Sequence, residues 1–185
     1  QSADATVVAI ADKDATRLDR LAATYPGTEM MNDADALIAR PDIDAVVVAL
    51  PVSLHFEFAR KALKAGKHCL VEKPLAQSTV ECRELIEAAK TANKVLMVGH
   101  TFEYNAAVQR VRQEIDAGNL GDVLQIISQR LNLGQVRTDV DALWNLAPHD
   151  ISIALYWLDH VAPKWVSAQG FSFIQHAVAD MGTIT

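Results

Sequence analysis

Glu72-Lys73-Pro74 closes a short apolar run, residues 68–71, and has the residue types that suit proton transfer beside a bound ligand. The run has the composition of a buried strand, and in open α/β sheets ligands bind at the carboxyl ends of the strands. Partial burial at that edge favours a lowered pKa for the Lys73 amine and proton transfer near neutral pH. The alternative is a solvated Glu-Lys pair in a turn.

A second candidate site lies in residues 144–150, WNLAPHD, where Asn145 and His149 have the i, i+4 spacing of one helical face. We expect a helix over 148–158 with Pro148 in its first turn. The positive end of its dipole would lower the pKa of His149 and leave a neutral imidazole that accepts a proton. Asp150 would orient His149 or cap the helix, and the alternative role for His149 is a buried histidine bonded to backbone carbonyls.

Asp12 follows residues 6–11, TVVAIA, which have the β-branched composition of a strand. In a dinucleotide-binding fold, an acidic residue at this place binds the adenosine ribose hydroxyls and disfavours a 2′-phosphate. Asp12 would equally serve as the N-cap of the next helix, and Lys13 could receive a phosphate. Both roles stay open, with NAD favoured over NADP.

Two further loops follow predicted strands and carry polar side chains. After the strand 44–50, Pro51 forces an extended turn, Ser53 would cap the next helix, and His55 is interpreted as a surface histidine that faces ligand or solvent. After the strand 94–98, Gly99 would allow a ligand close to the backbone, and His100 is more often a loop histidine. No two of the six histidines are four residues apart and there is no Cys-x-x-Cys, so we predict no metal site.

The elements that must position these residues alternate along the first hundred residues. Short connections between them predict right-handed βαβ units and a parallel sheet with helices on both faces. The predicted strands are 6–11, 44–50, 68–71 and 94–98, and the predicted helices are 14–25, 33–39, 54–65 and 78–93.

The pattern changes near Asn105 to that of an α+β domain. The predicted fold class is therefore α/β: a Rossmann-type parallel sheet over residues 1–104, then part of a C-terminal substrate and oligomerisation domain over 105–185 with a mostly antiparallel sheet. The second part is predicted to hold helices at 105–117 and 148–158 and strands at 123–133, 164–173 and 177–185.

None of the eight glycines forms the phosphate-binding pattern G-x-G-x-x-G. A dinucleotide fold that begins with the strand before Asp12 would lack its first strand, its phosphate turn and its first helix. We therefore expect the sequence to be an internal piece of a longer protein.

Composition limits the classes of partner. The 185 residues carry a net charge of −6 and are 50% hydrophobic, enough for one core or one domain plus part of a second. The acidity gives no support for nucleic-acid or anionic-membrane partners, and no apolar run approaches the roughly 20 residues of a membrane span. Cys69 and Cys82 lack metal-ligand spacing and suit a reducing compartment, so we expect a cytoplasmic protein.

Residues 46–75, VVVALPVSLHFEFARKALKAGKHCLVEKPL, strongly resemble the glucose–fructose oxidoreductase / inositol dehydrogenase / MocA (Gfo/Idh/MocA) family, in which Glu-Lys-Pro is the most specific short signature. The segment LWNLAPHDISIALYWL resembles the family's catalytic helix. The resemblance implies that Lys73 contacts the substrate hydroxyl and the nicotinamide ribose, and that His149 is the general base. Asn145 stands where many members have aspartate, which removes a negative charge beside His149.

The resemblance also implies a cofactor cleft, with Asp12 on the adenosine ribose and Pro51, Ser53, His55 and Glu72 along the wall. Ser53 stands where many members have asparagine. The complete set predicted to bind cofactor is Asp12, Lys13, Leu50, Pro51, Ser53, His55, Glu72, Lys73 and His100.

The implied function is an NAD(P)-dependent dehydrogenase that acts on CH–OH groups and moves a hydride between a sugar-like carbon, such as that of a nucleotide sugar or inositol, and nicotinamide. NAD is the expected cofactor and NADP the second choice. The alternatives are a non-catalytic sugar- or cofactor-binding protein of the same fold, or a fragment inactive in isolation. The expected assembly is a homo-oligomer formed through the C-terminal sheet.

Overall fold

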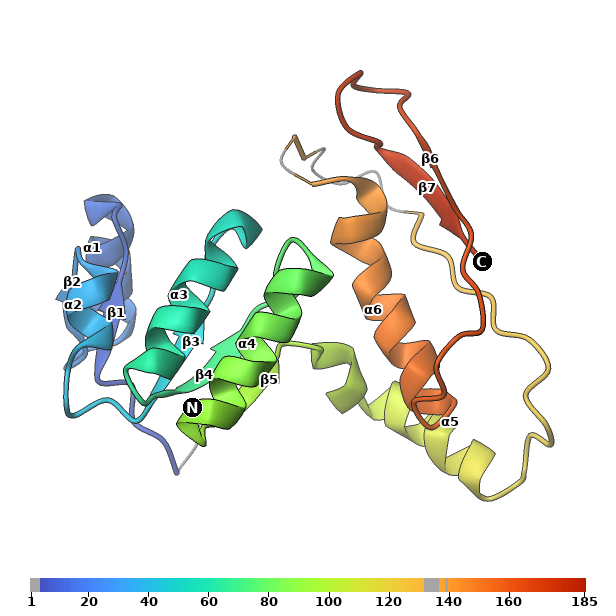
Figure 1. The fold of residues 1–185 in the computed structure, drawn as a ribbon, viewed down its shortest axis with the longest axis horizontal. Helices are drawn as coiled ribbons and strands as arrows, with labels where there is room; N and C mark the ends of the chain where they lie inside the picture. Colours follow the sequence, from blue (N-terminus) through green and yellow to red (C-terminus); the bar gives the residue numbers. More distant parts are fainter. Residues whose placement is uncertain (1–3, 132–136, 139) are drawn as a thin grey trace. The chain divides into compact units, whose positions relative to one another are not determined.

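The computed structural model describes residues 4–131, 137–138 and 140–185. These residues fall into two compact units, one reaching to Val98 and the other starting at Gly99 (Figure 1).

The first unit alternates strands and helices, as predicted (Figure 1). One strand, β2, was not predicted, because Glu29-Met30-Met31 is short and has no β-branched residue. The strands are β1 (Ala9–Ala11), β2 (Glu29–Met31), β3 (Ala45–Val48), β4 (His68–Val71) and β5 (Leu96–Val98), and the helices are α1 (Ala15–Thr24), α2 (Ala34–Ile38), α3 (Val52–Lys64) and α4 (Thr79–Ala92).

All strand pairs of the first unit are parallel, which confirms the predicted Rossmann-type α/β class. In the described residues the strands form two hydrogen-bonded groups, β1–β2 and β3–β4–β5, rather than one continuous sheet. In the larger group Val46 lies opposite Cys69, and Cys69 lies opposite Leu96. The carboxyl ends of β3 and β4 therefore meet at one edge.

The core of the first unit lies between the larger sheet and helices α3 and α4. It contains fully covered residues from each of these elements, among them Leu63, Val71 and Leu85. Burial raises the pKa of the Cys69 thiol to about 11. On the opposite face of the sheet Val47 and Met97 are 64% and 40% exposed, so within the described chain helices do not cover both faces as predicted.

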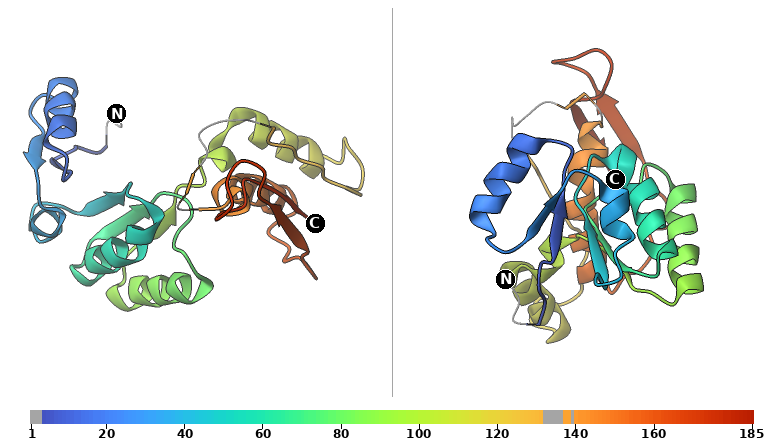
Figure 2. Two further views of the ribbon diagram at one scale, coloured as in Figure 1. Left: turned by 90° about the horizontal axis from the view of Figure 1, so that it is seen from above. Right: turned by 90° about the vertical axis from the view of Figure 1, so that its left-hand side faces the viewer.

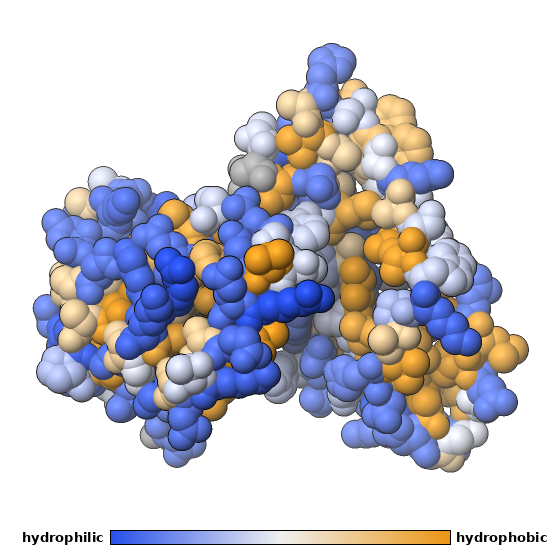
Figure 3. Space-filling view, viewed as in Figure 1, coloured by the Kyte–Doolittle hydropathy of each residue, from blue (hydrophilic) through white to orange (hydrophobic). Residues whose placement is uncertain are grey.

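The second unit contains the 3₁₀ helix η1 (Thr101–Tyr104), helices α5 (Ala106–Asp116) and α6 (Ala142–Trp157), and strands β6 (Ala168–Phe171) and β7 (Met181–Ile184) (Figure 2). Strands β6 and β7 pair antiparallel, as predicted for this part. Apolar side chains lie exposed on its surface (Figure 3), with Leu124 and Leu131 each more than four-fifths exposed. No helix within the described ranges is long and apolar enough to span a membrane.

Two predictions for the second unit are wrong. Residues 123–131 form no strand although their sequence alternates, because within the described part of the chain no neighbouring strand pairs with them; residues 132 and 133 of that prediction lie outside the described residues. Helix α6 begins at Ala142, with Asp141 as its N-cap accepting the Trp144 amide at 2.7 Å, and holds Pro148 inside it. Pro148 was predicted to lie in the first turn of the helix, whereas Asp141 caps the start of the helix one and a half to two turns earlier.

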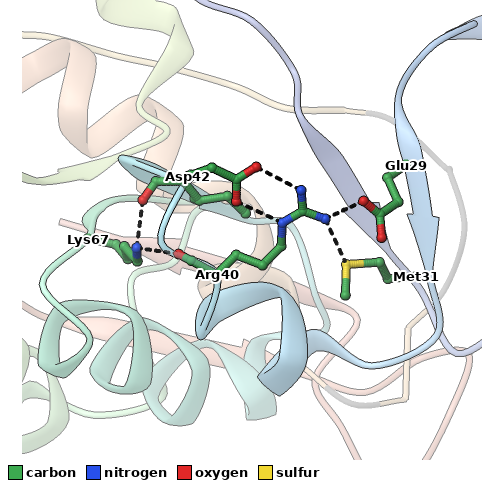
Figure 4. Close-up of polar contacts among 6 residues, drawn as sticks. Glu29, Met31, Arg40, Asp42 and Lys67 are labelled. Atoms are coloured by element: carbon green, nitrogen blue, oxygen red, sulfur yellow. Dashed lines mark hydrogen bonds and ion pairs between the residues drawn. The ribbon is translucent and has the colours of Figure 1, made fainter.

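A polar cluster around Arg40 and Lys67 links the connection between α2 and β3 to the residue before β4 (Figure 4). The buried amine of Lys67 donates to the carbonyls of Arg40 at 2.6 Å and Ile43 at 2.7 Å. The Arg40 guanidinium pairs with Asp42 at 2.8 Å and with Glu29. One buried side chain thus satisfies two carbonyls at the amino end of the sheet.

Replacing Lys67 with methionine keeps the aliphatic chain but removes both donors. We expect Lys67→Met to lower the free energy of unfolding by about 1–3 kcal/mol, because two carbonyls lose their partner. Urea unfolding monitored by circular dichroism measures this, with Lys64→Met as the control because Lys64 is exposed at the end of α3. Equal stability of both variants would contradict the structural role of Lys67.

Candidate active site

The Glu72-Lys73-Pro74 turn leaves the carboxyl end of β4, where the sequence placed it. The Glu72 amide donates to the Val48 carbonyl at 2.9 Å, which fixes the start of the turn to the last residue of β3. Glu72 is exposed and Lys73 is half-buried. The lysine therefore stands at the ligand-binding edge of a parallel sheet, on a segment tied to the neighbouring strand.

His55 is not a surface histidine; that interpretation is wrong, since the residue is only 1% exposed. Helix α3 begins at Val52, and His55 lies on its buried face with Val52, Ala59 and Ala62, which are three or four residues apart. Its Nδ1 lies 2.8 Å from the Pro74 carbonyl oxygen, and its Nε2 lies 2.7 Å from that of Leu50. A ring so covered has almost no surface to offer a bound molecule.

The loop between β3 and α3 presents two exposed residues, Pro51 and Ser53. Pro51 is the N-cap of α3 and no side chain caps that helix, so the predicted capping role of Ser53 is wrong. The helix starts one residue before Ser53, which leaves the hydroxyl on its first turn. Leu50 is half-buried, and its carbonyl faces His55 rather than the outside.

Asp12 follows β1 directly, and its carboxylate already has two partners. It accepts the Asp14 amide at 2.9 Å and pairs with the Arg17 guanidinium at 2.7 Å. The Asp14 amide, and to a lesser degree Arg17, lower the pKa of Asp12, so this carboxyl is an anion at neutral pH. Asp14, not Asp12, caps α1, which rules out the alternative role of Asp12 as the cap. Lys13 beside it is exposed.

His149 lies in α6 one helical turn after Asn145, so the two residues share a face of this helix as predicted. The expected effect of the helix dipole on His149 is wrong, because α6 begins at Ala142 and the dipole acts mainly within the first turn. The Phe102 ring meets the His149 ring edge-on, with centroids 4.8 Å apart and an interplanar angle of 65°.

Asp150 neither caps the helix nor bonds His149 in this structure. Its carboxylate accepts Arg130 Nε at 2.5 Å and Ser128 Oγ at 2.6 Å. The Arg130 guanidinium also lies over the Phe102 ring, 4.8 Å from the centroid. Asp150 therefore holds Arg130 against Phe102, and Phe102 in turn packs on the histidine.

Sequence reasoning missed Phe102 and Arg130 as neighbours of His149. Phe102 is only two residues from the predicted His100, but nothing local connects it with a helix more than 40 residues later. Arg130 fell in a predicted strand. His100 itself has a buried Nδ1 with no hydrogen-bond partner among the described residues.

The predicted site residues are thus divided between the two units. Lys73 and the loops after β1 and β3 belong to the first, whereas Asn145, His149 and His100 belong to the second. Their meeting at one reacting carbon stays a prediction. Among the described residues, no group of three or more histidine, cysteine or acidic side chains is arranged to hold a metal ion.

The sequence and the fold of this chain are similar to those of known proteins. A family model for Gfo/Idh/MocA proteins, described as an oxidoreductase family with an NAD-binding Rossmann fold, matches residues 1–100. The chain is 32% identical over 158 residues to 4-carboxy-2-hydroxymuconate-6-semialdehyde dehydrogenase of a Sphingobium species, covering 81% of this chain and 50% of that protein. It is 35% identical over 150 residues to UDP-N-acetylglucosamine 3-dehydrogenase of Acidithiobacillus ferrooxidans, covering 80% and 45%.

Among solved structures, an NAD-binding oxidoreductase from Klebsiella pneumoniae superposes with a TM-score of 0.79 at 26% identity, over 96% of this chain and 53% of that one. The chain thus spans at most about half the length of these relatives. The matched family model confirms a nicotinamide dinucleotide as the class of cofactor. Since that match covers residues 1–100 of 185, the chain belongs to the Gfo/Idh/MocA family of oxidoreductases.

Proposed function

We propose that the protein carrying this chain is an NAD(P)-dependent dehydrogenase that moves a hydride between a CH–OH carbon of a sugar-like substrate and nicotinamide. The observation that carries the proposal is the half-buried Lys73 on a turn tied to the carboxyl edge of a parallel sheet, in a chain whose family binds NAD. A lysine at such an edge lies where a ligand's hydroxyl or ribose would meet it.

The residues of the first unit fit the adenosine half of a dinucleotide. Asp12 is an ionised acceptor directly after a parallel strand, where ribose hydroxyls bind in this class of fold. Pro51 and Ser53 are exposed on the loop after β3 and would line the path of the cofactor. The bound cofactor supplies hydride acceptance, and the side chains of this chain supply position and proton transfer.

In the proposed reaction Lys73 and His149 have different roles toward one substrate hydroxyl and its proton. Lys73 binds the substrate hydroxyl, and His149 takes its proton as the hydride leaves the same carbon for the cofactor. The products are a carbonyl compound, the reduced cofactor and one proton, so atoms and electrons balance. Asn145, one turn before His149, would hold the substrate or the ring by an amide hydrogen bond in place of a carboxylate.

A sugar-like substrate is supported by the relative that is a UDP-N-acetylglucosamine 3-dehydrogenase. Other relatives are reductases of dTDP-linked 2,6-dideoxy sugars, one of them 37% identical over 115 residues. The muconate semialdehyde dehydrogenase widens the range, because its substrate is a carboxylated chain. A secondary alcohol or its carbonyl on a polar, multiply oxygenated substrate is the proposed class.

Oligomerisation through the second unit is a further part of the proposal. Strands β6 and β7 pair only with each other in the described chain, and Phe171 and Met181 on them are 40% and 50% exposed. A two-stranded sheet with apolar side chains in solvent is suited to cover by another polypeptide.

Alanine at Lys73 or His149 tests the assignment of roles. In the full-length gene product we expect each variant to lower kcat by about 100- to 10,000-fold, because each removes a group that holds or moves the reacting proton. Steady-state NADH formation with a panel of sugars and nucleotide sugars measures kcat, and a fluorescence titration with NAD+ checks that the cofactor still binds. Lys64→Ala and His176→Ala are the matched controls, since both residues are exposed.

Wild-type turnover in both Lys73→Ala and His149→Ala would end this assignment. Saturable NAD+ binding without hydride transfer to any substrate of the panel would instead indicate a non-catalytic binding protein.

Alanine at Asp12 tests the cofactor assignment. Loss of the carboxylate removes the ribose acceptor and releases Arg17, whose guanidinium can then meet a 2′-phosphate. We expect the Kd for NAD+ to rise about 10-fold or more while the Kd for NADP+ rises less or falls. Isothermal titration with both dinucleotides measures this. Asp19→Ala, an exposed position on the same helix α1, serves as the control. Unchanged affinities would remove Asp12 from the site.

A further inference from the structure

His55 is a buried, titratable side chain that the proposed chemistry does not use. It lies on the inward face of α3, and both of its ring nitrogens face backbone carbonyl oxygens, at 2.8 Å from Pro74 and 2.7 Å from Leu50. These two carbonyls belong to different segments, one just beyond the end of β3 and the other in the turn after β4. The ring is therefore a bridge between the exits of two neighbouring strands.

The chemistry of the two contacts limits the state of the ring. A carbonyl oxygen only accepts hydrogen bonds, and a neutral imidazole has a single N–H to donate. Both contacts are hydrogen bonds only when each ring nitrogen carries a proton. A neutral ring bonds one of the two carbonyls, and the tautomer with its proton on Nδ1 bonds that of Pro74.

The two neighbours of Lys73 in the chain, Glu72 and Pro74, are each attached to another segment of the first unit. On one side, the amide of Glu72 donates to the Val48 carbonyl at 2.9 Å. On the other side, the carbonyl of Pro74 accepts from His55. Lys73 is the single residue between these two attached neighbours, so its backbone has little freedom and its side chain starts from a fixed point.

We propose that His55 is a positioning residue for Lys73: with its Nδ1 proton on the Pro74 carbonyl, it ties the Glu72-Lys73-Pro74 turn to α3 near the end of β3 and so sets where the lysine amine lies. The catalytic consequence rests on the proposed function, whereas the placement of the amine does not. Displacement of a reacting group by about 1 Å costs up to about 100-fold in rate, so the bridge controls turnover rather than only stability.

Lys67 provides a matched control within the same unit. Lys67 is also a buried side chain that lies between two backbone carbonyls, and it donates to those of Arg40 and Ile43. It precedes β4, however, whereas the turn that His55 holds follows that strand. Its removal should destabilise the fold in a similar way without moving Lys73.

The experiment compares His55→Gln with Lys67→Met in the full-length gene product. Glutamine has no ring nitrogen at the place of Nδ1, and its donors lie on a single terminal nitrogen. It therefore does not reproduce the bond to the Pro74 carbonyl beside the contact with Leu50. Protein labelled with ¹³C-lysine gives the Lys73 Cε resonance, assigned with Lys73→Arg, and urea unfolding gives stability. We expect His55→Gln to shift that resonance and to lower kcat about 10- to 100-fold with a smaller change in KM. Lys67→Met should change neither kcat nor the resonance, at a comparable loss of stability.

An unshifted Lys73 resonance in His55→Gln, or an equal shift in Lys67→Met, would overturn the positioning role. A shifted resonance combined with full turnover of Lys73→Ala would sustain the positioning role and refute the proposed function instead. If His55→Gln does not fold, the wild-type protein decides: long-range ¹H–¹⁵N spectra of labelled histidine must show a proton on Nδ1 of His55, and a bare Nδ1 would refute the bond to the Pro74 carbonyl.

Discussion

Parallel pairing between β3 and β4 is the constraint on which the rest of the first unit depends. It brings the carboxyl ends of both strands to one edge, and the segments that leave this edge carry Ser53, His55, Glu72 and Lys73. Parallel strands need long crossovers, which here are α3 and α4, and both helices bury apolar faces against the sheet. The core thus fixes the positions of the strands, and the end of β4 fixes the backbone position of Lys73.

The second unit surrounds its histidine by a different means. His149 lies on helix α6 rather than at the end of a strand. Asp150 binds Arg130, Arg130 lies over the Phe102 ring, and that ring packs on His149. A carboxylate that neutralises an arginine, and an arginine that lies on an aromatic face, each restrict the next group. The Phe102 ring packs edge-on against the histidine, and the Asp150–Arg130 pair holds that ring.

The sequence predicted most of the first unit because its information is local. Residues 68–71 are a four-residue apolar run, and Gly66 ends the helix before them with a φ of +72°, as a C-capping glycine does. His55 was predicted to be a surface residue because histidine is polar, yet the spacing of Val52, His55 and Ala59 places it on the buried face of α3.

Side-chain contacts between distant segments of the second unit were not predicted. No feature of the sequence around Asp150 indicates that Arg130, 20 residues earlier, is its partner. Pro148 suggested that α6 starts at that residue, whereas Asp141 caps the start of the helix. The alternation of residues 123–131 indicated a strand, yet a strand requires a partner as well as a pattern. Composition reveals a segment's preference, whereas pairing depends on the rest of the chain.

The thiol of Cys69 sits in the middle of the strand that delivers the lysine, and it is almost completely covered. With its pKa raised to about 11, it stays protonated at neutral pH and reacts slowly with peroxides and electrophiles, which attack the thiolate. A sulfenic or sulfinic group at this place would force a polar atom between β4 and the helices that cover it. The same apolar cover that shapes the sheet therefore also protects it from oxidative damage, and a cysteine can persist there without acting as a redox sensor.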